Sequence, residues 1–334
     1  MKDLLTVVML TGIYGLLSAS FFVAMDAVDV AFTEASVGAG ISTLLMLVAV
    51  SMTGRSEHST RHKPLLAFVV VIITGGLLIY GTLDMPYFGT ADAPIHENVA
   101  PRYINASLQE VGVINIVTSV LASYRAFDTF GEVVVIFTAG IGVLALLSVV
   151  RRPENDVEIE SLNESMHEQH LILRIVTKML IPFILLFALY VQFHGDYGPG
   201  GGFQAGVIFA AAIILYAMLF GLSTARRVIN HTFIRLIAAL GVLLYGCVGV
   251  ASLLNGGNFL EYNVLLDEPI AGQHLGILLI ELGVGCTVAS VMVIIFFNFA
   301  GRKDYKHNQQ NKKEVKDKTI LNDEEDHDDH HGAL

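Results

Sequence analysis

Charge is scarce in this chain. Asp, Glu, Lys and Arg make up 15% of its 334 residues, whereas a soluble domain carries roughly 25%. Tryptophan is absent, proline occurs 8 times, and the two cysteines form neither a CxxC pair nor a disulfide framework. The formal net charge of −11 excludes a nucleic-acid-binding protein, which needs a basic face. So little charge among so many apolar residues also excludes a disordered protein and argues against an ordinary cytosolic enzyme.

Long apolar runs take the place of charge. The chain is 54% hydrophobic with a mean hydropathy of +0.62, and its apolar runs reach about 20 residues, the length that crosses a bilayer as a helix. We predict an all-α polytopic membrane protein with about eight spanning helices. These are expected near residues 4–25, 31–52, 64–82, 129–150, 172–193, 203–221, 236–254 and 275–299. A further stretch, 106–124, is only half apolar and predicts a helix that lies flat or half-buried against others.

Two hydrophilic segments divide the chain. Residues 153–168 are acidic and predict a linker between two membrane domains of four spans each, 1–152 and 169–300. The tail, 301–334, begins basic and ends in acidic residues and histidines. This composition predicts a disordered, charged, cytoplasmic tail. Metal capture by the tail histidines is the alternative.

The distribution of Lys and Arg predicts the orientation of the spans, because these residues stay preferentially on the cytoplasmic side. Before the tail, ten fall on one side of the predicted helices and two, Arg102 and Arg125, on the other. The ten are Lys2, Arg55, Arg61, Lys63, Arg151, Arg152, Arg174, Arg226, Arg227 and Arg235. We therefore predict a multi-pass protein of the cell membrane with both termini in the cytoplasm and the loops 83–105 and 255–274 outside.

Ionisable residues inside the predicted spans are the first functional candidates, because a charge in a membrane is costly unless it is paired or hydrated. Glu34 lies deeper than Asp26 and Asp29, which are expected at the outer helix end. Gly38 and Gly40 follow it and permit a backbone irregularity that would admit water. The alternative is a helix-end carboxylate that a neighbouring donor satisfies.

Two further carboxylates have similar settings. Arg125, Asp128 and Glu132 are spaced to share one helix face. Thr129 followed by Glu132 also fits a capping box, so a structural role for Glu132 competes evenly with a place in an ion pathway. Glu281 lies inside the last span among small residues, which favours a functional or inter-subunit role.

The remaining candidates are one amine, one imidazole and a glycine-rich loop. Lys178 lies within the fifth span and either snorkels to the cytoplasmic interface or acts as a relay amine. His194 supplies an imidazole, a group typical of proton relays. It opens the loop to the sixth span, whose motif residues are Pro199, Gly200, Gly201, Gly202, Phe203 and Gly206. A tight interhelical turn is the alternative for this loop. We find no Ser/His/Asp set, nucleotide loop, haem motif or tetrahedral metal set, and therefore expect no cofactor and no bound metal.

The strings around these residues resemble known families. Residues 172–297 resemble the MnhB/MrpB subunit of Mrp-type multisubunit Na+/H+ antiporters, through LYVQFHGDYGPGGGFQAGVIFAAA, GGNFLEYN and LIELGVGCTVASVMVIIFF. The first half resembles the C-terminal membrane module of the large A subunit, which also exists as separate MbhD- and MbhE-like subunits of membrane-bound hydrogenases. This second resemblance is carried by DAVDVAFTEASVGAGIST, LDMPYFG and NIVTSVLASYRAFDTFGE.

The resemblance implies a membrane subunit of a Na+/H+ antiporter that contributes carboxylates to an ion pathway and docks the larger subunits. It implies a transporter subunit and no enzyme. The implied partners are large A- and D-like and small C-, E-, F- and G-like subunits, with Na+ and H+ as transported ions. The fourteen-helix ion-pumping module of the A subunit is absent. Within this family setting we expect Glu34 to be the most transport-sensitive residue.

Two alternatives to the antiporter remain. One is the equivalent subunit of a group-4 hydrogenase or another complex-I-like, redox-driven ion pump. The other is a purely structural scaffold that holds larger subunits together.

Overall fold

A computed structural model describes residues 3–57, 64–87, 89–147 and 171–328. Within these ranges the secondary structure is helical, with one isolated β-bridge between Asp3 and Ser56. Eight of the described helices are long and apolar enough to cross a membrane: Leu4–Ala24, Val28–Thr53, Leu65–Thr82, Ala126–Leu147, Ile172–His194, Gly202–Phe220, His231–Leu254 and Pro269–Gly301. The predicted all-α polytopic architecture is confirmed. The acidic linker predicted at 153–168 lies outside the described residues.

The helices follow one another in this order. The first half contains α1 (Leu4–Ala24), α2 (Val28–Glu34), η1 (Ala35–Ser42), α3 (Thr43–Thr53), α4 (Pro64–Thr82), η2 (Ile95–Val99), α5 (Ala100–Glu110), α6 (Ile116–Thr118), η3 (Ser119–Tyr124) and α7 (Ala126–Leu147). The second half contains α9 (Leu171–His194), α10 (Gly202–Phe220), α11 (Leu222–Val228), α12 (His231–Leu254), η4 (Tyr262–Val264) and α13 (Pro269–Asp328).

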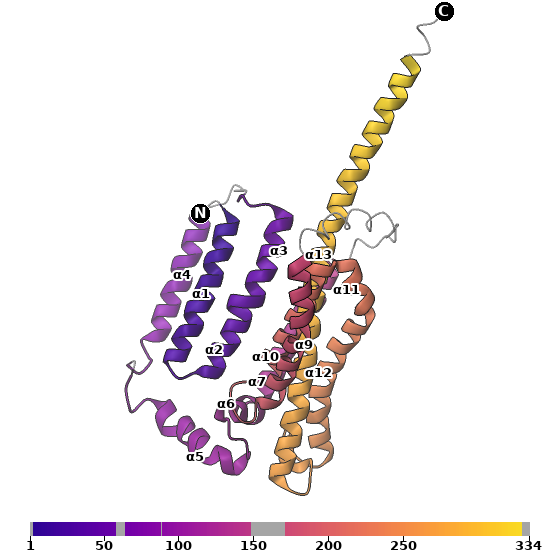
Figure 1. Ribbon diagram of the computed structural model, residues 1–334. Helices are drawn as coiled ribbons and strands as arrows, with labels where there is room; N and C mark the ends of the chain where they lie inside the picture. The colour runs from indigo at the N-terminus through magenta and orange to yellow at the C-terminus, as the bar shows by residue number, and fades with distance from the viewer. Residues whose placement is uncertain (1–2, 58–63, 88, 148–170, 329–334) are drawn as a thin grey trace, which may run out of the picture.

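Helices of the first half of the sequence pack against helices of the second half. α1 packs against α2, η1 and α3, whereas α7 packs against α12 and α13 of the second half (Figure 1). α10 and α13 also contact the span that α2, η1 and α3 form together. The first half is therefore joined to the second through two separate sets of contacts, one on each side of the break at α5 and α6.

α13 is the central helix of the molecule. It contacts α7, α10 and α12 as well as η4, and its membrane span, Pro269–Gly301, is the most buried of the eight described spans. Small residues allow the close approach: a Cβ on Gly206 of α10 would lie 2.8 Å from the carbonyl oxygen of Gly285. A Cβ on Gly283 would lie 2.7 Å from the carbonyl oxygen of Gly241 on α12. Such backbone contact is how helices gain packing energy in lipid.

A π-helical segment interrupts the second span. η1, from Ala35 to Ser42, lies between α2 and α3 without ending the helix. It contains Gly38 and Gly40, where the sequence allows an irregular backbone. α1 packs closely here, since a Cβ on Gly15 would lie 2.8 Å from the carbonyl carbon of Gly38. π segments of this kind occur frequently at functional sites.

The stretch 106–124 differs from the single helix expected there. α5 ends at Glu110, Gly112 adopts a φ of +81°, and a new helix begins after Asn115. Val111 and Val113 on either side of the glycine are almost fully buried in the core. The chain turns at this point because only glycine adopts a positive φ without strain, and because burying both valines anchors the turn.

The last helix also extends beyond its predicted end. α13 continues from Pro269 to Asp328, whereas the sequence predicted a span near 275–299 followed by a disordered tail. Residues 302–328 contain neither proline nor glycine, and lysine, the commonest residue among them, is a good helix former. Nothing in this composition ends the helix that the membrane span begins.

Candidate functional site

A cavity of about 330 Å³ lies where the two halves of the chain meet. α2, the α6–η3 segment, α7, the start of α10 and α13 all contribute to its wall. Three carboxylates line it: Asp29 from α2, Glu132 from α7 and Glu281 from α13. The tertiary structure thus brings together acidic residues that are separated by more than 100 positions in the sequence.

Asn115 ties three segments together beside this cavity. Its side-chain oxygen accepts from Val117 N at 3.0 Å and caps α6. Its Nδ2 donates to the carbonyl oxygens of Gly195 at 3.1 Å and Gly198 at 3.0 Å, and lies 3.4 Å from Asp29 Oδ2. One amide therefore holds the α9–α10 loop, the start of α6 and the Asp29 carboxylate in a common arrangement.

The glycine-rich loop before α10 forms one wall of the cavity. Gly200 N donates to Asp29 Oδ1 at 3.2 Å, and Gly201 N donates to Val191 O at 3.0 Å. Gly201 has a φ of +117°, which strains any other residue type. α10 begins at the next residue, and its positive dipole end lies beside the carboxylates of the cavity. Gly200, Gly201, Gly202 and Phe203 all line the cavity, whereas Pro199 is exposed.

Glu281 is partly buried on the central helix, against this loop. A Cβ on Gly201 would lie 3.0 Å from Glu281 Oε1, so the glycine leaves the space that the carboxylate occupies. The negative charges of Asp196 and Asp29 act on the same carboxylate. Asp196 Oδ2 in turn lies 3.4 Å from Nδ1 of His274, whose side chain is partly exposed.

The capping box at Thr129 and Glu132, one of the two alternatives for Glu132, is not formed. α7 begins three residues earlier, at Ala126, where Arg125 O accepts from Asp128 N at 3.0 Å and from Thr129 N at 3.3 Å. Thr129 is therefore inside the helix, and its hydroxyl donates to Leu121 O at 2.7 Å. Glu132 therefore caps no helix, and it lines the cavity instead.

The other candidates from the sequence lie away from the cavity. Arg125 and Asp128 form an exposed ion pair with each other. Lys178 lies with its Nζ 5.3 Å from the centre of the Phe220 ring, at the end of α10 opposite the cavity. Glu34 does not line the cavity, although Asp29 on the same helix does. His194 stacks on Tyr190, with 4.9 Å between the ring centres.

The structure adds polar residues that the sequence analysis did not select. Gln204 Nε2 donates to Thr33 Oγ1 at 2.9 Å and so joins α10 to α2 within the cavity wall. Thr118 donates to Gly195 O at 2.7 Å. Asp29 and Thr33 are four residues apart and share a helix face, so their spacing in the sequence could have identified them as a polar pair. Asn115 lies within the half-apolar stretch 106–124 and carries no such signal.

A separate polar cluster lies outside the spans, on α5 and η3. Tyr124 donates a short hydrogen bond to the Glu110 carboxylate, and Arg102 lies 3.5 Å from the same carboxylate. The hydrogen bond from Tyr124, with the nearby Arg102 charge, lowers the pKa of Glu110. Partial burial and the contact with Glu110 raise the pKa of Tyr124 to about 12. The cluster therefore stays ionised at Glu110 and protonated at Tyr124 at neutral pH, and fastens α5 to η3.

The cavity is suited to protons or small cations. Carboxylates, hydroxyls, an amide and backbone groups line it together, and intramembrane carboxylates mark ion paths. Among the residues that the structure describes, no three His, Cys, Asp or Glu side chains converge closely enough to hold a metal ion. The three carboxylates come to the cavity from three different helices, α2, α7 and α13.

Comparison with known proteins gives consistent matches along the chain. Residues 172–294 match the family model described as a domain related to the MnhB subunit of the Na+/H+ antiporter. Residues 1–55 match the MbhD family of MBH components, and residues 67–164 match the MbhE family. A protein named as putative antiporter subunit mnhB2 of Staphylococcus aureus strain Newman is 34% identical over 139 residues, which is 41% of this chain and 98% of that protein. The same values are found in strain JH1.

Two solved structures share the fold. The Mrp complex from Dietzia sp. DQ12-45-1b aligns with a TM-score of 0.70 and 26% identity, over 90% of this chain. The alignment covers 33% of the matched chain, so this protein spans about a third of that chain. The membrane-bound sulfane sulfur reductase, an archaeal respiratory membrane complex, aligns with a TM-score of 0.51 and 28% identity, over 71% of this chain and 98% of the matched one. With a relative matched over almost its whole length, this chain belongs to the family of MnhB-type Na+/H+ antiporter subunits.

Proposed function

We propose that this protein is a membrane subunit of a multisubunit Na+/H+ antiporter and that its cavity is part of the ion pathway. The observation that carries the proposal is that Asp29, Glu132 and Glu281 all line one cavity inside an antiporter-family fold. A carboxylate in such a place exchanges a proton or binds Na+ because the surrounding membrane offers few other polar partners. The hydroxyls and the Gln204 amide supply neutral ligands between the charged positions.

The exposed apolar faces of the spans support assembly with other subunits. Every described residue of α4 except Gly75 is exposed in the isolated chain, although this span is among the most hydrophobic. The matched chain of the Mrp complex extends well beyond the part aligned here. We infer that large A- and D-like subunits and small C-, E-, F- and G-like subunits cover the exposed faces that lipid does not.

A redox-driven complex is the second candidate, supported by the match to the sulfane sulfur reductase and by the two MBH family models. The lower TM-score makes this support weaker than that for the antiporter. In both settings the chain would contribute the same cavity and the same carboxylates. In the redox setting a partner protein would carry out the electron transfer.

Removal of the chain tests the proposal. Everted vesicles from cells that lack it are expected to lose Na+-dependent collapse of a pH gradient, and the wild-type gene is expected to restore it. A tagged chain should copurify antiporter subunits. Copurification of iron–sulfur subunits would instead favour the redox complex, and undiminished Na+/H+ exchange without the chain would contradict the antiporter proposal.

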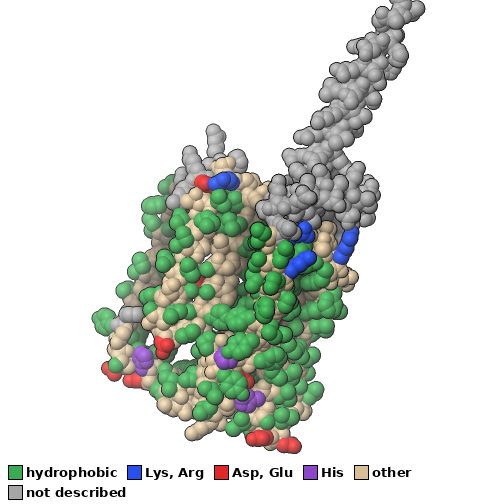
Figure 2. Space-filling view, in the orientation of Figure 1, with side chains coloured by type: hydrophobic (Ala, Val, Ile, Leu, Met, Phe, Trp, Pro, Cys, Tyr) green, Lys and Arg blue, Asp and Glu red, His purple; other side chains and the backbone are tan. Residues whose placement is uncertain are grey.

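We also propose that both termini are cytoplasmic. On the face that Figure 2 shows, Lys and Arg side chains gather at the end of the molecule where Figure 1 places the N-terminus and the extension of α13, and most Asp, Glu and His side chains lie toward the other end. This asymmetry agrees with the positive-inside rule.

Cysteine labelling tests the orientation. In a chain with Cys247 and Cys286 replaced by serine, a cysteine at Glu268 should react with a membrane-impermeant maleimide added to intact cells. A cysteine at Ser223, at the opposite end, should react only after permeabilisation. The reverse pattern would invert the topology.

A further inference from the structure

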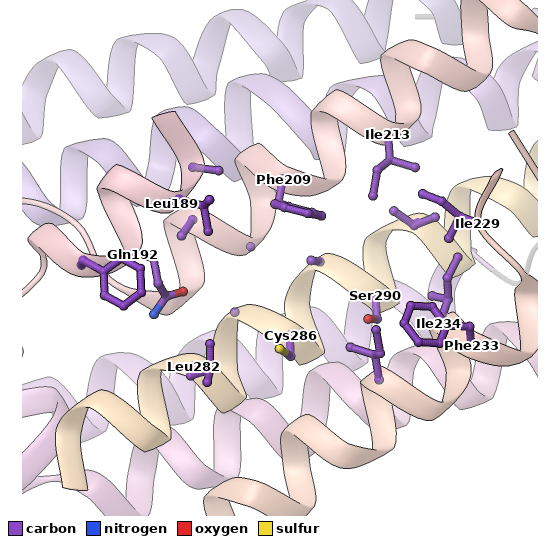
Figure 3. Close-up of a pocket in the computed structure, with 18 residues that line it drawn as sticks. Leu189, Gln192, Phe209, Ile213, Ile229, Phe233, Ile234, Leu282, Cys286 and Ser290 are labelled. Carbon is purple, nitrogen blue, oxygen red and sulfur yellow. The ribbon is translucent and has the colours of Figure 1, made fainter. Parts of the chain in front are cut away.

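A second cavity, an apolar groove of about 420 Å³, lies between α9, α10, α12 and α13 (Figure 3). Its wall includes the side chains of Leu189, Phe209, Ile213, Phe233, Ile234 and Leu282. It shares no lining residue with the carboxylate cavity. Leu282 follows Glu281 directly, so the two spaces lie on different faces of the central helix.

The length of the groove matches one leaflet of a membrane. On α13 it extends from Leu282 to Val293, a rise of about 16 Å at 1.5 Å per residue. The hydrocarbon core of a bilayer is about 30 Å thick, so one leaflet contributes about 15 Å. One end of the groove is at Ile229 and Phe233, beside the α11–α12 turn, and the other is at Gln192.

Basic side chains lie at one end of the groove. Arg227 precedes Ile229 by two positions, and Arg235 lies between the lining residues Ile234 and Ile237; both arginines are exposed. Arg226 Nη2 donates to Phe297 O at 2.9 Å and secures this end of α13. Positive charge at this level attracts the anionic headgroups of the cytoplasmic leaflet.

An apolar cavity remains dry and takes up apolar ligands. We propose that the groove binds one acyl chain of an anionic phospholipid from the leaflet at the α11–α12 turn. The lipid phosphate contacts Arg227 and Arg235, and the acyl chain extends along α13 towards Gln192. The inference concerns lipid binding and stands independently of the ion pathway.

Photocrosslinking of the purified, assembled complex tests this site. The probe is phosphatidylglycerol with a diazirine in its acyl chain, and phosphatidylcholine with the same chains is the comparison. Phosphatidylglycerol should label peptides of α10 and α13 at least about fivefold more strongly. Ala289→Phe, which fills the groove, should reduce labelling by a similar factor, and the double substitution Arg227→Gln with Arg235→Gln should remove the preference for phosphatidylglycerol.

Substitution of Gln192 tests which end of the groove holds the lipid headgroup. Its Nε2 is buried and has no hydrogen-bond partner among the described residues. If the headgroup lies at the arginine end, Gln192→Leu should preserve or increase labelling, because the Gln192 end of the groove then contacts only the terminal methylenes of the acyl chain. Loss of labelling in this variant would place a polar part of the ligand at Gln192 and would overturn the proposed direction.

The two native cysteines give a second measurement in the wild-type complex, which does not depend on whether Ala289→Phe assembles. Cys286 lines the groove, whereas Cys247 is exposed outside it. Removal of lipid should increase the reaction of Cys286 with a small apolar maleimide several-fold and leave Cys247 unchanged. Equal labelling by both lipids with no effect of groove filling would refute the site. Crosslinking of Cys286 to a helix of another subunit would show that protein occupies the groove.

Discussion

Replacement of Glu281 by Gln is expected to lower Na+/H+ exchange in everted vesicles by about 100-fold, a typical effect of removing a proton-transfer group. The amide keeps the shape of the side chain but cannot carry a proton or offer a negative charge to Na+. Glu281 lies on the central helix, lines the cavity and contacts the glycine-rich loop. Glu281→Asp should retain part of the activity because the carboxylate remains, although its position is shifted.

The matched control is Glu268→Gln, because Glu268 is an exposed carboxylate just before α13. It should leave both assembly and exchange unchanged. A fully assembled Glu281→Gln complex that exchanges ions at the wild-type rate from pH 7 to pH 9 would show that Glu281 has a structural role.

Comparison with Glu34→Gln separates two views of the pathway. The sequence favours Glu34 as the most sensitive position, whereas Asp29, and not Glu34, lines the cavity on that helix. The structure therefore leads us to expect a smaller effect for Glu34→Gln than for Glu281→Gln in the same assay. A larger effect at Glu34 would place the main proton path on the other side of α2.

Replacement of Asn115 by Ala is expected to destabilise the junction between the halves by about 2 kcal/mol, the combined scale of a helix cap and the hydrogen bonds lost with it. The substitution removes the α6 cap and the hydrogen bonds from the side-chain amide to the carbonyl oxygens of Gly195 and Gly198, of which Gly195 O keeps its bond from Thr118. Asp29 also loses a neighbour that orients its carboxylate. The thermal unfolding midpoint of the purified complex should fall, and exchange should fall with it.

Asn115→Asp distinguishes the role of Asn115 in orienting the Asp29 carboxylate from its role as the cap of α6. Aspartate caps a helix as well as asparagine does, but here its charge would face Asp29 and two carbonyl oxygens. Exchange at neutral pH should therefore fall more than in Asn115→Ala and recover partly at lower pH, where one carboxylate is protonated. Asn98→Ala, at an exposed asparagine of η2 whose side chain donates to Pro94 O, is the control and should match the wild type. Wild-type exchange in Asn115→Asp at every pH would exclude the positioning role.

Local patterns in the sequence determined the class and the spans of this protein. The length and hydropathy of a run decide whether it crosses a membrane, and both are properties of neighbouring residues. The eight predicted spans therefore agree with the eight described ones to within a few residues at most ends. The strings around Pro199 and Glu34 likewise led to the antiporter family, which the family models support.

Tertiary structure alone decided which carboxylates meet. Asp29 and Glu34 are five positions apart, which places them roughly 140° apart around a helix, and their sequence context does not tell which face meets the second half of the chain. Contact of α2 with α10 and of α7 with α13 selects Asp29 and Glu132 for the cavity. Glu132 was undecided in the sequence because its capping role depended on where α7 begins. The hydrogen bonds from Asp128 N and Thr129 N to Arg125 O mark that point. The break at Gly112 similarly depends on the burial of Val111 and Val113 against distant helices, a long-range contact that no local pattern contains.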